Sequence, residues 1–226
     1  MKAISKVLAA VCMAATLGLF AGCSKKAAAT TGKTLNVMVE VEVESLDPQQ
    51  ATDGTSFEVI ADFTDGLKQM NADGSTTNAL CASETVSEDG LTYTFKLRDD
   101  AFWSNGDPVT ADDFVFGWQR AADPKLASEY AYMLSDIGQV KNAAAVEAGT
   151  LPVDQLGVKA VDNKTFEVQL EVPVSYFDKI LYFPTFYPVN KAFYEKCGDK
   201  YATSADTTLS NGAFILTDYQ PAAVSF

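Results

Sequence analysis

Three stretches of the chain alternate apolar and polar residues with the period of two that a β-strand requires. Residues 35–43, which read LNVMVEVEV, place five apolar side chains on one face and mostly Glu and Asn on the other. Residues 91–97 read LTYTFKL, and residues 165–172 read TFEVQLEV after an Asp162-Asn163 turn. Each of these patterns predicts a strand with one buried face.

Two other stretches carry the start and stop signals of helices. Thr110 is followed three residues later by Asp113, the spacing of a capping box, and Asp123-Pro124 ends the pattern. A second helix is predicted from Asn190 as its N-cap to Gly198 just beyond its last residue. Strands separated by helices and long loops, without a regular βαβ repeat, predict a mixed α/β fold. The first helix has an apolar face formed by Phe114, Trp118 and Ala121.

An aromatic cluster is predicted around a tight turn in the middle of the chain. Asn105-Gly106 supplies the positive φ that such a turn needs, and Pro108 fixes the backbone ahead of the first helix. Four rings near this turn are predicted to form a compact core rather than to contact a ligand. They belong to Phe102, Trp103, Phe114 and Trp118.

The N-terminus has the organisation of an export signal. Lys2 and Lys6 precede an apolar run of 14 residues, which is too short to span a bilayer comfortably. The run ends in LFAGC, which resembles a bacterial lipobox, and Cys23 is therefore expected to carry a lipid. The alternative is a plain secretory signal in which Cys23 is incidental. We expect residues 1–22 to be a lipoprotein signal peptide and residues 23–34, which are small and polar, to be a flexible tether.

The composition is that of a folded, acidic protein. Of 226 residues, 47% are hydrophobic and 21% are charged, so the chain can bury a core. The net charge of −13, with no His, argues against nucleic acid as a partner, because a phosphate backbone requires clustered Lys and Arg. Removal of residues 1–22 leaves 15 basic and 30 acidic residues, a net charge of −15. Such a chain is not attracted to anionic lipid, so a lipid on Cys23 would have to hold it at the membrane.

The reactive side chains favour binding over catalysis. Without His, a Ser or Cys nucleophile has no supporting motif, and the sequence has no Gly-rich phosphate loop. It also has no CxxC pair, so a metal or haem site is not supported and we expect no cofactor. Cys81 and Cys197 could form a disulfide, although Cys197 is predicted to pack as a small buried residue. A carboxylate-pair glycosidase stays an alternative, since 30 acidic residues make some close pair inevitable.

Several motifs occur along the chain in a recognisable order. Residues 83–124 read SETVSEDGLTYTFKLRDDAFWSNGDPVTADDFVFGWQRAADP. Around them stand ESLDPQ at 44–49, LASEYAYML at 126–134, LGVKAVDNKTFEVQLEVPVSYF at 156–177 and NGAFILTDY at 211–219. Together they resemble the extracytoplasmic solute-binding proteins of the oligopeptide-binding family, which supply ABC importers. The family often has Trp where this chain has Glu84, a departure expected to weaken one core contact.

The resemblance implies a two-lobed fold of the periplasmic-binding-protein type, of which this chain would be the truncated N-terminal part. Residues 35–64 would begin the first domain, residues 65–188 would form a smaller inserted α/β domain, and residues 189–226 would return to the first domain. The chain would then end before the second lobe, with Phe214 and Leu216 left as exposed apolar surface.

By the same resemblance, a peptide ligand would be held mainly by a loop after the first strand. The stretch DPQQATDGTSF, residues 47–57, is small and polar, and Thr52, Asp53 and Gly54 are candidates for main-chain contacts to an extended peptide. An ordinary surface turn at Asp53-Gly54 is the alternative. Tyr130 matches a family tyrosine that faces the peptide, with core packing as its alternative.

The function implied is that of a lipid-anchored, extracytoplasmic and monomeric peptide-binding subunit without enzyme activity. Its partners would be a peptide ligand and the permease subunits of an ABC transporter. Nickel, haem or a murein peptide could replace the oligopeptide as the ligand. Two other classes compete with this interpretation: an extracytoplasmic hydrolase such as the glycosidase, and a lipid-anchored interaction module that uses the inserted domain alone.

Overall fold

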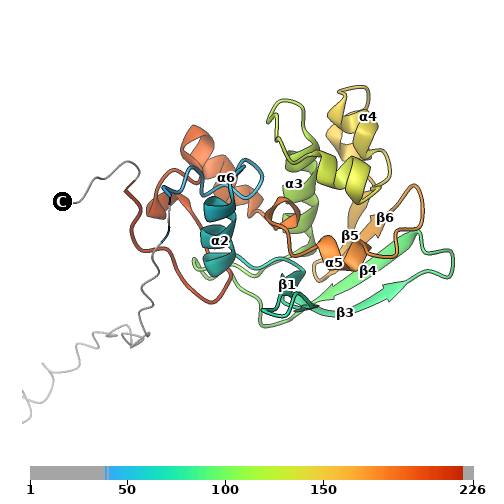
Figure 1. The fold of residues 1–226 in the computed structure, drawn as a ribbon, viewed down its shortest axis with the longest axis horizontal. Coiled ribbons are helices and arrows are strands. Elements are labelled where there is room, and N and C mark those ends of the chain that lie inside the picture. Colours follow the sequence, from blue (N-terminus) through green and yellow to red (C-terminus); the bar gives the residue numbers. More distant parts are fainter. Residues whose placement is uncertain (1–38, 40, 221–226) are drawn as a thin grey trace, which may run out of the picture. The chain divides into compact units, whose positions relative to one another are not determined.

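Four antiparallel strands form the largest sheet of the protein, whose computed structural model is drawn in Figure 1. The structure describes residue 39 and residues 41–220, and the predicted signal peptide and tether lie outside them. The description below concerns the unit that begins at residue 39, taken by itself. No helix in this described part is long and apolar enough to cross a membrane.

The strands of the large sheet run in the order β3-β4-β6-β5. A second, small sheet pairs β1 with β2. The bounds are β1 (Lys68–Met70), β2 (Thr76–Asn78), β3 (Cys81–Val86), β4 (Thr92–Leu97), β5 (Val158–Asp162) and β6 (Thr165–Gln169).

One face of the large sheet is apolar and buried. Alternation along β4 buries Tyr93, Phe95 and Leu97, because successive residues of a strand point to opposite faces. In the neighbouring strand β6, Phe166 pairs with Phe95 and Val168 pairs with Tyr93. The sequence patterns at 91–97 and 165–172 therefore predicted these two strands correctly, although β6 ends three residues earlier than its pattern.

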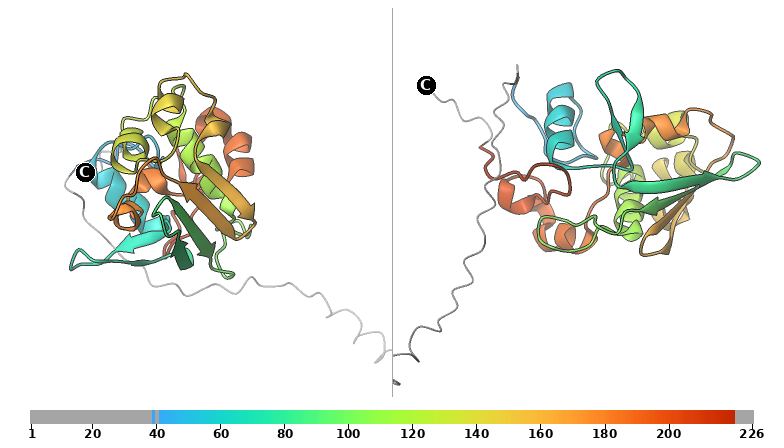
Figure 2. Two further views of the ribbon diagram at one scale, coloured as in Figure 1. Left: turned by 90° about the vertical axis from the view of Figure 1, so that its right-hand side faces the viewer. Right: turned by 90° about the horizontal axis from the view of Figure 1, so that it is seen from below.

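Helix α3 (Ala111–Ala122) packs against this buried face (Figures 1 and 2). Its capping box is present: the backbone N–H of Thr110 donates to the carboxylate of Asp113 over 2.8 Å, and the indole of Trp103 donates to the same oxygen over 3.1 Å. The rings of Phe114 and Trp118 lie 5.5 and 5.1 Å from that of Phe166, between centroids. The predicted start and end of this helix are confirmed.

The other helices are short and surround this central pair of layers. Helix α6 begins after Asn190, whose side chain accepts from the N–H of Phe193 over 2.9 Å, as the sequence predicted. The α-helices are α2 (Gly54–Phe63), α4 (Ala143–Glu147), α5 (Phe177–Ile180) and α6 (Lys191–Cys197), and η1 (Met133–Ile137) is a π-helix. Single 3-10 turns are η2 (Val153–Gln155), η3 (Pro184–Phe186), η4 (Gly198–Lys200) and η5 (Ala205–Thr207).

Buried apolar side chains form two clusters. The larger lies between the large sheet and α3, and all its buried members fall between Leu67 and Phe186. The smaller is formed by residues before and after that range, namely Leu46, Ala51, Ile60, Phe63, Tyr187 and Ala202. Segments from both ends of the described chain thus share one small core.

A buried ion pair joins the parts of the chain that carry the two clusters. The guanidinium of Arg120, in the last turn of α3, donates to both carboxylate oxygens of Asp47 and, over 2.8 Å, to the side-chain oxygen of Gln49. Its central carbon lies 4.7 Å from the ring centre of Tyr194 and 5.2 Å from that of Tyr201. One side chain of α3 therefore holds both the segment before α2 and the segment around α6.

The fold class is confirmed as mixed α/β, but two predictions about its parts are wrong. No strand forms at residue 39 or at residues 41–45, because no other described strand pairs with this segment; residues 35–38 and 40 lie outside the described part. Phe102 is 52% exposed and is not a core residue, whereas the other three predicted rings are buried. It points away because it precedes Trp103 in an extended stretch, where neighbouring side chains alternate sides.

The cysteine and turn predictions have mixed outcomes. Cys81 and Cys197 are both free thiols, and Cys197 is only half-buried because α6 lies at the surface. Gly106 has a φ of 92°, which confirms the predicted turn.

Three other residues singled out in the sequence can also be placed. Phe214 is exposed as expected, but Leu216 is half-buried against the smaller cluster. Glu84, half-buried in β3, forms a 2.7 Å ion pair with Lys68.

Candidate functional site

The first predicted binding residues lie at the start of helix α2 rather than in a loop. Asp53 is the N-cap, and its side chain accepts from the N–H of Ser56 over 2.8 Å. Gly54 is the first helical residue and is exposed, and a Cβ added to it would meet nothing within 4 Å. Thr52, just before the cap, is half-buried. The main chain at Gly54 is therefore open to an approaching ligand.

The segment before α2 is fastened to the same helix end. The hydroxyl of Ser56 accepts from the N–H groups of Glu44 and Ser45 over 3.0 and 3.1 Å. One carboxylate oxygen of Asp53 caps the helix, and the other is buried with no hydrogen-bond partner in the described part of the chain. Burial, helped by the negative charges of Glu42 and Asp53, raises the pKa of Tyr219. The helix end is thus rigidly held and negatively charged.

Tyr130 belongs to a group of four aromatic side chains, which we call the aromatic shelf. Ring centroids are 5.2 Å apart for Phe57 and Tyr130, 5.1 Å for Tyr130 and Phe183, 4.9 Å for Phe57 and Phe183, and 5.6 Å for Tyr130 and Tyr132. These separations are those of favourable aromatic pairs. Tyr132 is 42% exposed and the other three rings are half-buried, so the shelf is ordered but not covered.

The shelf connects the two groups of predicted site residues. Phe57 follows Asp53 by four positions, so both lie on one face of the start of α2. Phe57 contacts Tyr130, and the predicted residues at 52–54 and Tyr130 are therefore neighbours through one ring. The hydroxyl of Tyr130 makes no hydrogen bond to any described residue, and it is available to a ligand.

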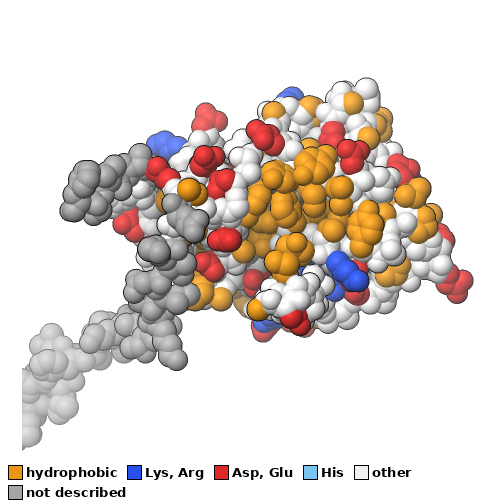
Figure 3. Space-filling model, in the orientation of Figure 1, with side chains coloured by type: hydrophobic (Ala, Val, Ile, Leu, Met, Phe, Trp, Pro, Cys, Tyr) orange, Lys and Arg blue, Asp and Glu red, His pale blue; other side chains and the backbone are white. Residues whose placement is uncertain are grey.

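Phe57, Tyr132 and Phe183 were missed by the sequence reasoning. The spacing of Asp53 and Phe57 signalled a helical face, but helix α2 was not predicted. Phe183 follows α5 and precedes η3, and nothing in its local pattern separates it from core residues such as Phe186. Figure 3 shows that hydrophobic side chains gather on this side of the molecule, between α2 and α5 of Figure 1.

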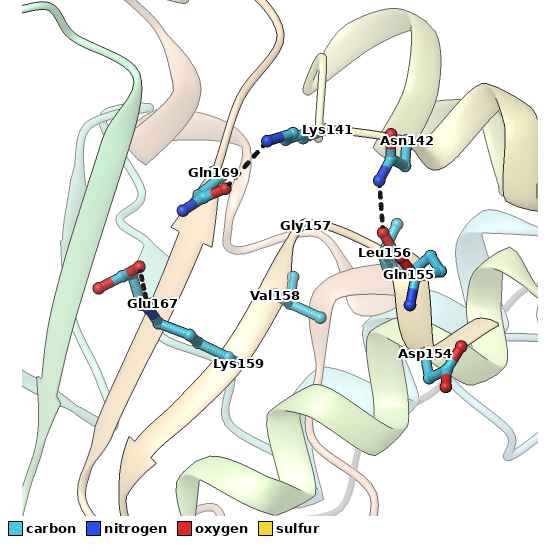
Figure 4. A pocket seen from close by; sticks show the side chains of 10 residues that line it. All are labelled: Lys141, Asn142, Asp154, Gln155, Leu156, Gly157, Val158, Lys159, Glu167 and Gln169. Carbon is cyan, nitrogen blue, oxygen red and sulfur yellow. Dashed lines mark hydrogen bonds and ion pairs between the residues drawn. The ribbon is translucent and has the colours of Figure 1, made fainter. Parts of the chain in front are cut away.

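Two hollows in the described surface lie away from the shelf. One, of about 190 Å³, is lined mostly by polar residues between β5, β6 and the start of α4, and none of the predicted site residues borders it (Figure 4). Its polar groups pair with each other: Lys159 with Glu167 over 2.8 Å, and the side-chain amide of Asn142 donates to the backbone carbonyl of Gln155 over 2.7 Å. A second hollow of about 350 Å³ lies between residues 98–102 and 211–213. Neither includes a shelf residue.

The chemistry of the shelf is that of a binding surface. The shelf has four rings, of which two are phenols, and exposed backbone at its edge, and its residues include no nucleophile with an adjacent base. Among the described residues no group of three or more His, Cys, Asp or Glu side chains is placed to hold a metal ion. The arrangement can stack on apolar groups and donate a hydrogen bond.

A comparison with protein families assigns the chain. The profile of bacterial extracellular solute-binding proteins, family 5 Middle, matches residues 75–226. The chain belongs to this family. Members of this family are solute-binding proteins and not enzymes.

Individual relatives agree with this assignment. The chain is 41% identical over 183 residues to a dipeptide-binding protein of Lactococcus lactis, covering 81% of this chain and 33% of the relative. It is 41% identical over 175 residues to a probable deoxycholate-binding periplasmic protein of Escherichia coli, covering 77% of this chain and 32% of the relative. The crystal structure of the substrate-binding domain of a Bacillus anthracis oligopeptide ABC transporter is 46% identical, with a TM-score of 0.76 over 84% of this chain and 35% of that one. The chain thus spans about a third of the length of these proteins.

Proposed function

We propose that this chain forms one wall of a peptide-binding site in the solute-binding subunit of an ABC importer. The observation that carries the proposal is the aromatic shelf: four ordered rings that are left uncovered in a member of a solute-binding family. A ligand that covers these rings removes apolar surface from water, at about 25 cal/mol per Å². The uncovered shelf is therefore the part of the described surface best suited to a partly apolar ligand.

A peptide suits this surface because it offers both kinds of group that the shelf can bind. Its side chains can pack on the rings, and its backbone can accept a hydrogen bond from the Tyr130 hydroxyl. The open main chain at Thr52, Asp53 and Gly54 can make further contacts that do not depend on the peptide sequence. These contacts would let one protein accept many peptides.

We further propose that the chain is organised as an inserted domain, residues 65–188, and a first domain made of residues 35–64 and 189–226. The two core clusters support this division, because every buried member of the larger lies within the insert, and every buried member of the smaller except Tyr187 lies in one of the two flanks. The shelf would then stand where the domains meet, since Phe57 packs on the smaller cluster and Phe183 on the larger.

The proposed location is extracytoplasmic, with a lipid on Cys23 as the membrane anchor and the importer's permease subunits as partners of a monomer. This part of the proposal rests on the sequence alone. Cys23→Ser should release the protein from membranes, whereas Cys197→Ser, which alters a half-buried thiol of α6, should not. Retention of the Cys23→Ser protein in the membrane pellet after a high-salt wash would contradict the anchor.

Substitution of Tyr130 tests the binding site. With the protein and its variants produced in the cells that make it naturally, Tyr130→Ala should weaken peptide binding by about 1–3 kcal/mol with little change in melting temperature. Tyr130→Phe should lose only the part of the binding free energy that the hydroxyl contributes. Phe102→Ala, which removes an exposed ring outside the shelf, is the matched control and should bind as the unaltered protein does.

Calorimetry with a peptide library measures these affinities. A large loss of stability with unchanged affinity in Tyr130→Ala would make Tyr130 a core residue and remove the shelf from the site. Turnover of a substrate panel, without saturable retention of peptide, would favour the rival hydrolase.

A further inference from the structure

The aromatic shelf is assembled from three segments that are distant in sequence. They are residues 53–63, which hold Phe57, residues 129–137, which hold Tyr130 and Tyr132, and residues 176–183, which end at Phe183. Ring contacts of 4.9–5.6 Å hold the shelf in place before any ligand arrives. A surface ordered in this way pays little conformational entropy on binding, so its chemistry can discriminate between ligands.

The same three segments carry a strong excess of negative charge. They contain six carboxylates and one Lys, at position 179. Figure 3 shows red Asp and Glu side chains along the border of the gathered hydrophobic side chains. By sequence, the six carboxylates of the three segments belong to Asp53, Glu58, Asp62, Glu129, Asp136 and Asp178.

Asp53 is the carboxylate most closely tied to the shelf. It lies on the same helical face as Phe57, four positions earlier. One of its carboxylate oxygens accepts from the N–H of Ser56, and the other has no hydrogen-bond partner among the described residues, so a local donor engages only one of the two oxygens. A partly buried carboxylate of this kind attracts a cation more strongly than a fully hydrated one.

We propose that the shelf selects peptides in which a Lys or Arg side chain stands next to an aromatic or large aliphatic one. The apolar side chain covers the rings, and the cation lies at the acidic border. Arg is the better of the two cations, because its planar guanidinium also stacks on tyrosine rings. This inference deepens the proposed function and rests on it.

The charge of the border also disfavours anionic ligands. A bile-acid anion such as deoxycholate could cover the rings with its steroid face, but its carboxylate would meet the same acidic border. The relative that is named for deoxycholate therefore makes this anion a useful competing ligand in the test.

Three tetrapeptides that differ only at their two central positions separate the contribution of the apolar side chain to binding from that of the cation. The central pairs are Phe-Arg, Phe-Glu and Gly-Arg, and binding is measured by calorimetry on the protein purified from its natural source. We expect Phe-Arg to bind about tenfold more tightly than either of the others at low salt. The advantage over Phe-Glu should shrink as salt is raised, because salt screens the acidic border, while the advantage over Gly-Arg should persist.

Two variants assign these effects to residues. Phe183→Ala should reduce the Phe-Arg advantage over Gly-Arg to about twofold and leave the discrimination against Phe-Glu. Asp53→Asn keeps a good N-cap residue and removes one charge, so it should lower the discrimination against Phe-Glu about threefold. Phe102→Ala is the control for both, and thermal melting confirms that each variant is folded.

The outcomes separate this inference from the proposed function. If all three peptides bind equally, or if Phe183→Ala behaves as Phe102→Ala does, the selectivity is wrong while peptide binding stands. If no peptide binds, both proposals fail. Tighter binding of deoxycholate than of the Phe-Arg peptide overturns the role of the acidic border.

Discussion

Replacement of Arg120 by Met should destabilise the folded chain severely, because it leaves the buried carboxylate of Asp47 unpaired. Met keeps the unbranched stem that packs along α3 and removes only the guanidinium. Asp47, whose side chain is 5% exposed, would then be a buried carboxylate with no cation. Burial tends to lower the pKa of Arg120, but the hydrogen bonds and charge of Asp47 outweigh it and raise that pKa, so Arg120 is charged in the native state at any ordinary pH.

The magnitude follows from the contacts that are lost. Breaking a buried, hydrogen-bonded ion pair by removal of one partner costs about 3–5 kcal/mol, mainly because the other charge stays buried. For a domain of this size each kcal/mol shifts the melting temperature by about 2–4 °C, so a decrease of about 6–20 °C is expected. The lost contacts to Tyr194 and Tyr201 place the result toward the upper part of this range.

Urea unfolding, followed through the fluorescence of the two buried tryptophans, measures the effect. Asp47→Asn combined with Arg120→Met should recover part of the loss, with a coupling energy of about 2–3 kcal/mol in the double-mutant cycle. Arg98→Ala is the matched control: it breaks the exposed pair with Asp100 and should cost less than about 1 kcal/mol. A loss below about 1 kcal/mol in Arg120→Met, or no coupling to Asp47, would refute the reasoning.

Three further predictions concern pH, thiol reactivity and domain organisation. Burial raises the pKa of Asp113, so the contribution of this side chain to stability is complete below the ordinary value of 3.8 and is lost as the pH rises through the raised value. The unfolding free energy of the natural chain, relative to that of Asp113→Asn, should therefore fall with rising pH. A difference that stays constant with pH would contradict this. Burial raises the pKa of Cys81 to about 11, so iodoacetamide at about pH 8 should alkylate the half-exposed Cys197 first, with peptide mass spectrometry as the measurement and equal rates as the contrary result. Limited proteolysis should leave residues 65–188 as the most resistant product, and even protection of the whole described chain would argue against the proposed division.

The sequence predicted best the elements whose signals are local. The alternation in residues 91–97 and 165–172 identified the two central strands, and the capping pattern at Thr110 and Asp113 located the start of α3. Such signals depend on neighbouring residues alone, so contacts with distant segments did not alter the elements that they predict. The opposite holds for residues 35–43, whose alternation is as regular but which find no partner strand in their described part.

The candidate site was predictable only in part. The resemblance indicated Tyr130 and residues 52–54, but Phe57 and Phe183 enter the site through contacts between distant segments. Helix α2 was missed because its capping residue, Asp53, was interpreted as part of a polar loop. Phe102 illustrates the reverse error, a residue that was predicted to be buried and is exposed. It is aromatic like the adjacent Trp103, and only the direction of its side chain distinguishes the two.

Mass spectrometry of the ligand that copurifies with the naturally produced protein is the most direct test of the account. We predict oligopeptides, enriched in sequences that place Arg or Lys beside an aromatic or large aliphatic residue. A bound metal ion, haem or steroid in place of peptide, or the absence of any retained ligand together with no binding of added peptides, would contradict the peptide-binding function proposed for this chain.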